Sequence, residues 1–192
     1  MRPGPEIDVC RTSHRRLLAA LAPLTDSDFR SPSLLPRYSR GHVVTHLANK
    51  TRSHVWLFGG PAAGEIRQLH PAGYDPDLAA DTGAGRSAAE LRSDLEQSFG
   101  LLEAAWDALD DVRWDHQGIM TAGPRTMAEI ISHHLRNVEV HQSIWTSAIG
   151  PPTGHRPSSK ANSPSDSARS RTELTTPTCL PGSSAERAHP NS

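Results

Sequence analysis

The stretch that decides the fold runs from residue 87 to residue 109 and reads SAAELRSDLEQSFGLLEAAWDAL. It opens with Ser87 and Glu90, a capping-box pair whose side chains bind the free backbone amides at a helix start. Large apolar residues then follow at the three- and four-residue intervals that place them on one helical face; they are Leu91, Leu95, Phe99, Leu102, Trp106 and Leu109. The stretch predicts an amphipathic helix with one buried side.

A second capping box marks the start of the last helix. Thr126 and Glu129 have the same spacing as Ser87 and Glu90, and the run after them keeps apolar residues on one face. His134 and His141 share that face with Val138. We therefore expect both histidines to point towards the core.

Two further helices are predicted nearer the N-terminus, at about residues 5–22 and over residues 43–58, because apolar residues recur there at helical spacing. Residues 61–86 show no period and are rich in proline and glycine, which indicates a long irregular loop. No alternating run of strand length separates the helices. The sequence thus predicts an all-α protein, an up-and-down four-helix bundle over residues 1–150.

The composition changes after Gly150. Serine, proline, threonine, arginine and asparagine dominate residues 151–192, where Leu174 and Leu180 are almost the only large aliphatic residues. Such a segment cannot bury a core, so we expect a disordered C-terminal tail. A frameshift near residues 142–150 would also explain the change, and the other reading frames of the coding DNA would reveal it.

Charge and cysteine content restrict the function classes. The 20 Lys and Arg residues nearly balance the 21 Asp and Glu residues, so the net charge does not favour nucleic acid or an anionic membrane as partner. Cys10 and Cys179 fit neither a disulfide framework nor a paired thiolate metal site, which favours the cytoplasm. The sequence has no signal-peptide pattern and no apolar run of 18 residues. We expect a soluble protein, a monomer or a homodimer, that binds small molecules.

The 11 histidines stand out, because histidine is the commonest metal ligand. Asn137 and His141 are four residues apart and so share a face of the last helix, while His46 can supply a ligand from the second helix. Three protein ligands and one open position are typical of a catalytic zinc site. On the spacing alone, His141 is better interpreted as a hydrogen-bonded core histidine.

Whole segments resemble the N-terminal domain of the mycothiol-dependent maleylpyruvate isomerases, a family in the DinB-like superfamily. The resemblance covers roughly residues 5–145 and rests on LTDSDFRSPSLLP (24–36), SRGHVVTHLA (39–48), GAGRSAAEL (83–91) and RNVEVH (136–141). It implies a four-helix bundle with a divalent metal, usually zinc, held by a histidine of the second helix and a Glu-x-x-x-His pair of the fourth. By position, His46 and His141 match the two histidines, whereas Asn137 stands where the family has glutamate.

The resemblance also implies a reaction. The metal binds the thiol of mycothiol and lowers its pKa, and the sulfur adds to maleylpyruvate, which is released as fumarylpyruvate; related proteins transfer the thiol to another electrophile. The partners would be a small-molecule thiol and a small electrophilic acid. Arg86 lies at a predicted helix start, where a guanidinium is suited to gripping the carboxylate of that acid.

Two alternatives stay open. The amide of Asn137 carries no charge and binds a divalent ion more weakly than a carboxylate, which favours a non-catalytic relic or binding protein on the same bundle. A metal-dependent hydrolase would need an activated water and no thiol. We interpret His133 and His134 as packing or helix-surface residues, and His42 and His54 as surface or supporting residues. We interpret the four tryptophans as core residues.

Overall fold

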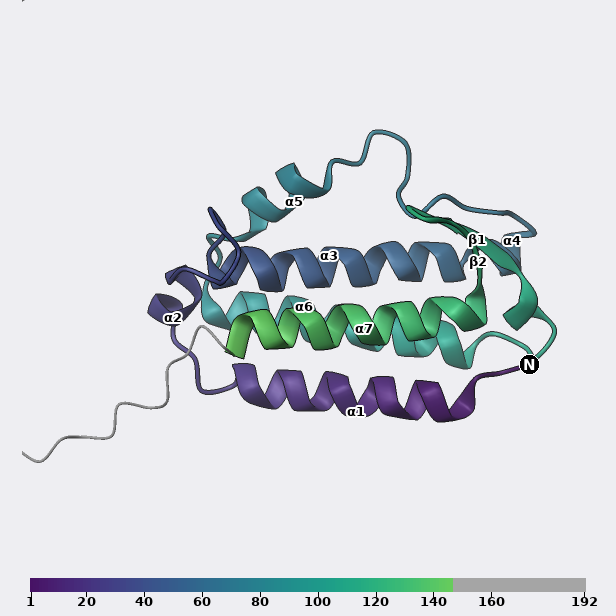
Figure 1. Ribbon diagram of the computed structural model, residues 1–192, viewed down its shortest axis with the longest axis horizontal. Coiled ribbons are helices and arrows are strands. Elements are labelled where there is room, and N and C mark those ends of the chain that lie inside the picture. The colour runs from purple at the N-terminus through teal and green to yellow at the C-terminus, as the bar shows by residue number, and fades with distance from the viewer. Residues whose placement is uncertain (147–192) are drawn as a thin grey trace, which may run out of the picture. The chain divides into compact units, whose positions relative to one another are not determined.

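The computed structural model describes residues 1–146 (Figure 1). The protein is mostly helical, and its longest helices lie side by side: α1 (Gly4–Leu21), α3 (Arg40–Phe58), α6 (Ala88–Asp107) and α7 (Met127–Thr146). Helix α3 contacts both α6 and α7, and α1 contacts the same two helices. Shorter helical segments occupy the connections: α2 (Asp26–Arg30), α4 (Gly60–Ala63), α5 (Pro76–Gly83) and the 3-10 turn η1 (Arg113–Asp115).

The predictions for the C-terminal segment, a disordered tail or out-of-frame sequence, lie outside the described residues. Within residues 1–146, we find no helix with the length and apolar character needed to cross a membrane.

Both predicted capping boxes form. The backbone N–H of Ser87 donates to Glu90 Oε2 at 2.9 Å, and the N–H of Glu90 donates to Ser87 Oγ at 3.3 Å. Thr126 and Glu129 make the equivalent pair of bonds at 2.8 and 3.2 Å. The local signals at these two helix starts therefore placed α6 and α7 correctly.

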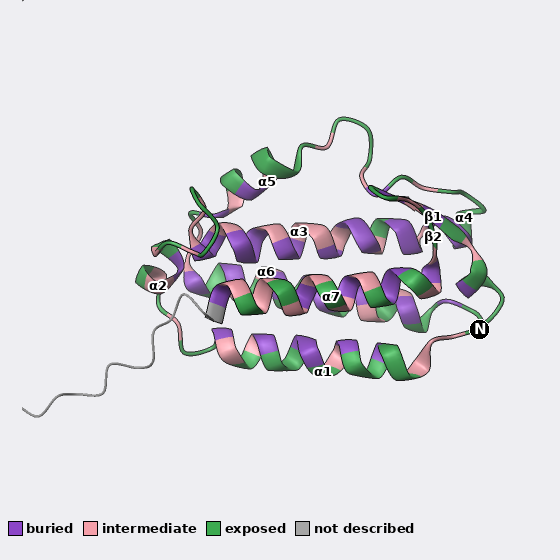
Figure 2. Cartoon of the chain, viewed as in Figure 1, coloured by how far each residue is buried: buried purple, intermediate pink, exposed green. Residues whose placement is uncertain are grey.

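The buried faces of the long helices meet in the interior (Figure 2). The predicted apolar faces are buried, because five of their residues are at most 2% exposed, namely Leu91, Leu95, Phe99, Leu102 and Val138. The prediction that every tryptophan belongs to the core is wrong for Trp56, which is 38% exposed. Its ring lies under the guanidinium of Arg67, with the guanidinium carbon 4.0 Å from the ring centroid, so an exposed cation–π contact replaces core packing.

The segment expected to be an irregular loop contains a helix, α5. Asp75 starts it, because Asp75 Oδ1 accepts hydrogen bonds from the N–H groups of Asp77 and Leu78 at 3.0 and 3.1 Å. Pro76 then occupies the first turn, where its missing N–H costs nothing. Helix α5 packs on α3, and this contact brings Asp77 to the site described below.

The expectation of no strands is also wrong. Strands β1 (Gln117–Met120) and β2 (Gly123–Thr126) form an antiparallel hairpin directly before α7. Each strand has only four residues, which is too short for an alternating pattern to be recognised. The turn residue Gly123 has φ 103°, a conformation that strongly favours glycine.

Candidate functional site

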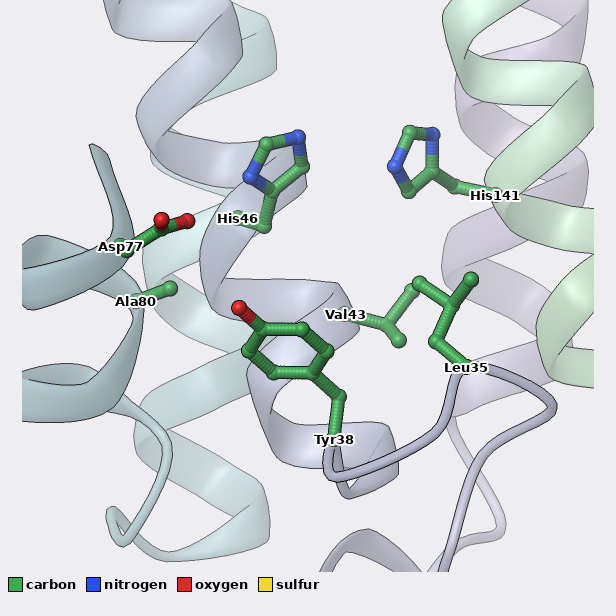
Figure 3. A pocket seen from close by; sticks show the side chains of 7 residues that line it. All are labelled: Leu35, Tyr38, Val43, His46, Asp77, Ala80 and His141. Carbon is green, nitrogen blue, oxygen red and sulfur yellow. The ribbon is translucent and has the colours of Figure 1, made fainter. Parts of the chain in front are cut away.

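A pocket of about 150 Å³ lies against α3, α5 and α7. It is lined by Leu35, Tyr38, Val43, His46, Asp77, Ala80 and His141 (Figure 3). His46 and His141 face each other across the pocket, with ring centroids 5.2 Å apart and ring planes inclined by 23°. The structure therefore brings together two residues that are far apart in the sequence and that were predicted to share a site.

Asn137 lies one helical turn before His141 on α7 and holds that histidine through its backbone. The Nδ1 of His141 donates to the carbonyl oxygen of Asn137 at 2.7 Å, so the Nε2 atom keeps its lone pair. This arrangement is common among metal-binding histidines, whose second nitrogen is fixed by a hydrogen bond. The side-chain Nδ2 of Asn137 is buried and has no hydrogen-bond partner within residues 1–146, and Asn137 is not one of the residues that line the pocket.

Burial keeps both imidazoles neutral. Desolvation lowers the pKa of His46 to about 4, and the nearby His141 and Lys50 lower it further. Desolvation likewise lowers the pKa of His141. Because only neutral imidazole binds a metal ion, both side chains are in the ligating form at neutral pH.

Asp77 brings a carboxylate to this pocket that the sequence analysis missed. Its carboxylate lies beside His46, on the side away from His141 (Figure 3). Its negative charge opposes the lowering of the His46 pKa without reversing it. The helix-start pattern of Asp75 and Pro76 was the signal that could have revealed it.

Two of the three predicted donor residues, His46 and His141, line the pocket. His46 and His141 supply neutral imidazoles, which suit zinc. At the predicted third position the sequence offers the uncharged amide of Asn137. Within the described residues, no three His, Cys, Asp or Glu side chains are arranged to hold a metal ion, and the fit depends on that amide.

Arg86 lies outside this pocket. Its Nε donates to the carbonyl oxygen of Gly83 and one terminal nitrogen donates to Asp94 Oδ2, both at 2.9 Å. Asp94 also pairs with Arg52. Burial would raise the pKa of Asp94, but the hydrogen bonds from the two arginines lower it below its usual value. Arg86 is thus engaged in an ion pair, and its predicted role in binding a carboxylate stays a prediction.

A buried chain of histidines crosses the core outside the pocket. His14 Nδ1 lies 2.6 Å from Glu103 Oε1, and His14 Nε2 lies 2.8 Å from His134 Nε2. His134 Nδ1 in turn lies 3.1 Å from His54 Nδ1. All three histidines are at most 2% exposed. A surface position for His54 is therefore wrong, whereas a packing role for His134 is consistent with its burial.

Cys10 is buried on α1 and is not a reactive thiol. Its Sγ donates to the carbonyl oxygen of Ile131 at 3.7 Å. Burial, reinforced by the negative charges of Glu103 and Glu139, raises its pKa to about 12. Since the thiolate is the reactive form, thiol chemistry in the described part of the chain would require a thiol supplied from outside.

Residues 10–143 match the family model of the mycothiol maleylpyruvate isomerase N-terminal domain. The chain is similar to a crystal structure of the mycothiol-dependent maleylpyruvate isomerase, with 20% identity and a TM-score of 0.70 over 74% of this chain and 60% of that one. A histidine-to-alanine mutant of that isomerase gives 19% identity and a TM-score of 0.69 over the same shares.

The chain thus spans about 60% of the length of these structures, and at this identity the likeness shows the fold. Among curated proteins, none matches the chain.

Proposed function

The chain belongs to the mycothiol maleylpyruvate isomerase N-terminal domain family, and on that premise we propose that it catalyses the addition of mycothiol to a small electrophilic acid. Isomerisation of maleylpyruvate to fumarylpyruvate is the first candidate reaction, and transfer of the thiol to another electrophile is the second.

We take the four long helices as an up-and-down bundle of the DinB-like type. We place the protein in the cytoplasm, as a monomer or a homodimer.

The observation that carries the proposal is the convergence of His46 and His141 from different helices, with ring centroids 5.2 Å apart. We infer that these two imidazoles and the amide of Asn137 would hold a divalent ion, with zinc the ion best suited to them. When bound, that ion would lower the pKa of a thiol so that thiolate predominates near neutral pH.

The other residues of the pocket would orient the reactants. Leu35, Val43 and Ala80 supply apolar walls that exclude water from the reacting sulfur. The Tyr38 hydroxyl points into the pocket (Figure 3), where it can donate a hydrogen bond to a carboxylate oxygen of the acid. A volume of about 150 Å³ admits a small acid or the sulfur-bearing end of a larger thiol.

A second candidate is a non-catalytic binding protein on the same fold, and Asn137 favours it. Without a glutamate at position 137, the site attracts a divalent ion less strongly. The apolar pocket then remains as a binding site for a small neutral ligand.

The test combines zinc titration with an assay of mycothiol-dependent maleylpyruvate isomerisation. We expect zinc-supported turnover in the wild type and its loss in both His46→Ala and His141→Ala, while Trp56→Ala, altered at an exposed position, keeps activity. Thiol-dependent turnover that survives both histidine substitutions would refute the metal site. Zinc binding without turnover of any acid would favour the binding protein.

A further inference from the structure

A second cavity, of about 320 Å³, lies between the β hairpin and helices α3 and α7. It shares no lining residue with the His46–His141 pocket. Its charged and polar lining comes from all three elements: Lys50 from α3, Arg125 from β2, and Glu129, Ser132, His133 and Arg136 from α7. The packing of the hairpin on the two helices therefore creates a strongly cationic cavity.

Within the described part of the chain, the cations of this cavity form no ion pair. Among the ion pairs formed within residues 1–146, none includes Lys50, Arg125 or Arg136. The carboxylate of Glu129 is engaged in the capping box, where its Oε2 accepts the N–H and the hydroxyl of Thr126 at 2.8 and 3.1 Å. Two arginines and Lys50 thus face a single carboxylate whose hydrogen bonds go to the helix start.

His133 indicates that these charges converge on one space. Burial lowers its pKa, and the positive charges of Lys50, Arg136 and Arg125 lower it further. Burial also lowers the pKa of Lys50. Like charges in a partly desolvated space repel each other, and a bound anion removes that cost.

We propose that this cavity is a binding site for a small oxyanion, a molecule that carries a phosphate, sulfate or carboxylate group. The guanidinium groups of Arg125 and Arg136 can donate paired hydrogen bonds to two oxygens of such a group, and Lys50 supplies a point charge. The hydroxyl of Ser132 and a ring N–H of His133 are further donors. A cavity of about 320 Å³ has room for the anionic group and a short organic portion. The proposal does not rest on the metal and thiol chemistry proposed for the other pocket.

Separate titrations of the full chain with inorganic phosphate, sulfate and succinate distinguish the possible anions. Calorimetry measures affinity, and NMR titration of the His133 ring measures its pKa. We expect at least one anion to bind and to raise the pKa of His133, because a nearby negative charge favours the protonated imidazole. Tighter phosphate or sulfate binding would identify a tetrahedral oxyanion site, and tighter succinate binding would identify a carboxylate site.

Two arginine variants test the location. Arg136→Ala should weaken binding by about tenfold, since it removes a charged hydrogen-bond donor. Arg15→Ala is the matched control, because it removes the same charge from α1, where Arg15 contacts Thr12 at 3.0 Å; its affinity should stay within about twofold of the wild type.

Equal weakening in the two variants would show a general net-charge effect and would overturn the proposal. So would failure of all three anions to bind with a dissociation constant below ~10 mM, or binding that leaves the pKa of His133 unchanged. Since no outcome depends on turnover, failure here leaves the proposed isomerase activity untouched.

Discussion

The Nε2 atoms of His14 and His134 lie 2.8 Å apart in the core, so one of them must donate and the other must accept. Glu103 accepts from His14 Nδ1 at 2.6 Å, which leaves His14 Nε2 as the acceptor and His134 Nε2 as the donor. His134 Nδ1 then accepts from His54 Nδ1 at 3.1 Å. In this order of donors the rings of His134 and His54 are neutral, and a lone pair is left on His54 Nε2, a buried atom with no partner in the described part of the chain.

Acid should destabilise the protein through the buried histidines His134 and His54. Burial and the facing histidines hold the pKa of His134 well below 6.5, and burial together with Lys50, His133 and His70 lowers that of His54 to about 3. The unfolded chain therefore gains protons below about pH 6.5 that the folded protein does not, so stability is full above this pH and falls as the pH drops towards the folded-state values.

Each of the two histidines should contribute about 1.4 kcal/mol per pH unit over that range. Urea unfolding from about pH 8 down to about pH 5 measures the effect. A free energy of unfolding that is constant across the range would contradict the assignment of neutral rings.

Replacing different histidines of this buried row should lower the free energy of unfolding by different amounts. His134→Leu leaves two buried nitrogens without partners, those of His14 and His54, whereas His54→Leu leaves only the Nδ1 of His134. Each orphaned group costs about 1–3 kcal/mol, so His134→Leu should lower the free energy of unfolding by the larger amount. Urea unfolding at neutral pH tests this order, and a larger loss in His54→Leu would reverse our interpretation of the hydrogen bonds.

Asn137→Glu should tighten zinc binding by about tenfold or more. The substitution adds a negative charge beside two imidazoles that burial keeps neutral. Asn137→Gln is the matched control, because it has the length of glutamate without the charge. Competition with a zinc chelator at neutral pH measures both affinities. Equal gains in the two variants would mean that the length of the side chain, and not its charge, determines the zinc affinity.

Two glycine substitutions should act in opposite directions. Gly123 has φ 103°, so Gly123→Ala strains the hairpin turn and should destabilise the protein by about 1 kcal/mol. Gly100 lies inside α6 with nothing within 4 Å of an added Cβ, so Gly100→Ala should stabilise it by about 0.5–1 kcal/mol. Thermal unfolding of both variants checks the signs, and destabilisation by Gly100→Ala would show a neighbour that the described residues do not include.

The sequence predicted what depends on local patterns. Capping residues such as Ser87 and Thr126 and the apolar stripe of α6 act over three to seven residues, so they can be read directly. The hairpin was missed because its short strands are specified by pairing between Gln117 and Thr126 rather than by alternation.

The site was only partly predictable for a related reason. His46 and His141 came from the family resemblance, whereas Asp77 depends on the docking of α5 against α3. The bond between His14 and Glu103 joins residues 89 positions apart, and no local pattern links them. The cationic cavity likewise exists only after the hairpin has packed on α3 and α7.

The burial of Cys10 has a use in following the motions of the helical core. A thiol whose pKa is about 12 and whose sulfur is enclosed does not react with a maleimide reagent at neutral pH. Labelling at Cys10 can therefore proceed only during the moments when α1 separates from its neighbours, and its rate relative to that of the unfolded chain gives the free energy of this opening. The natural residue Cys10 can thus report how often the helical core opens, without an engineered cysteine.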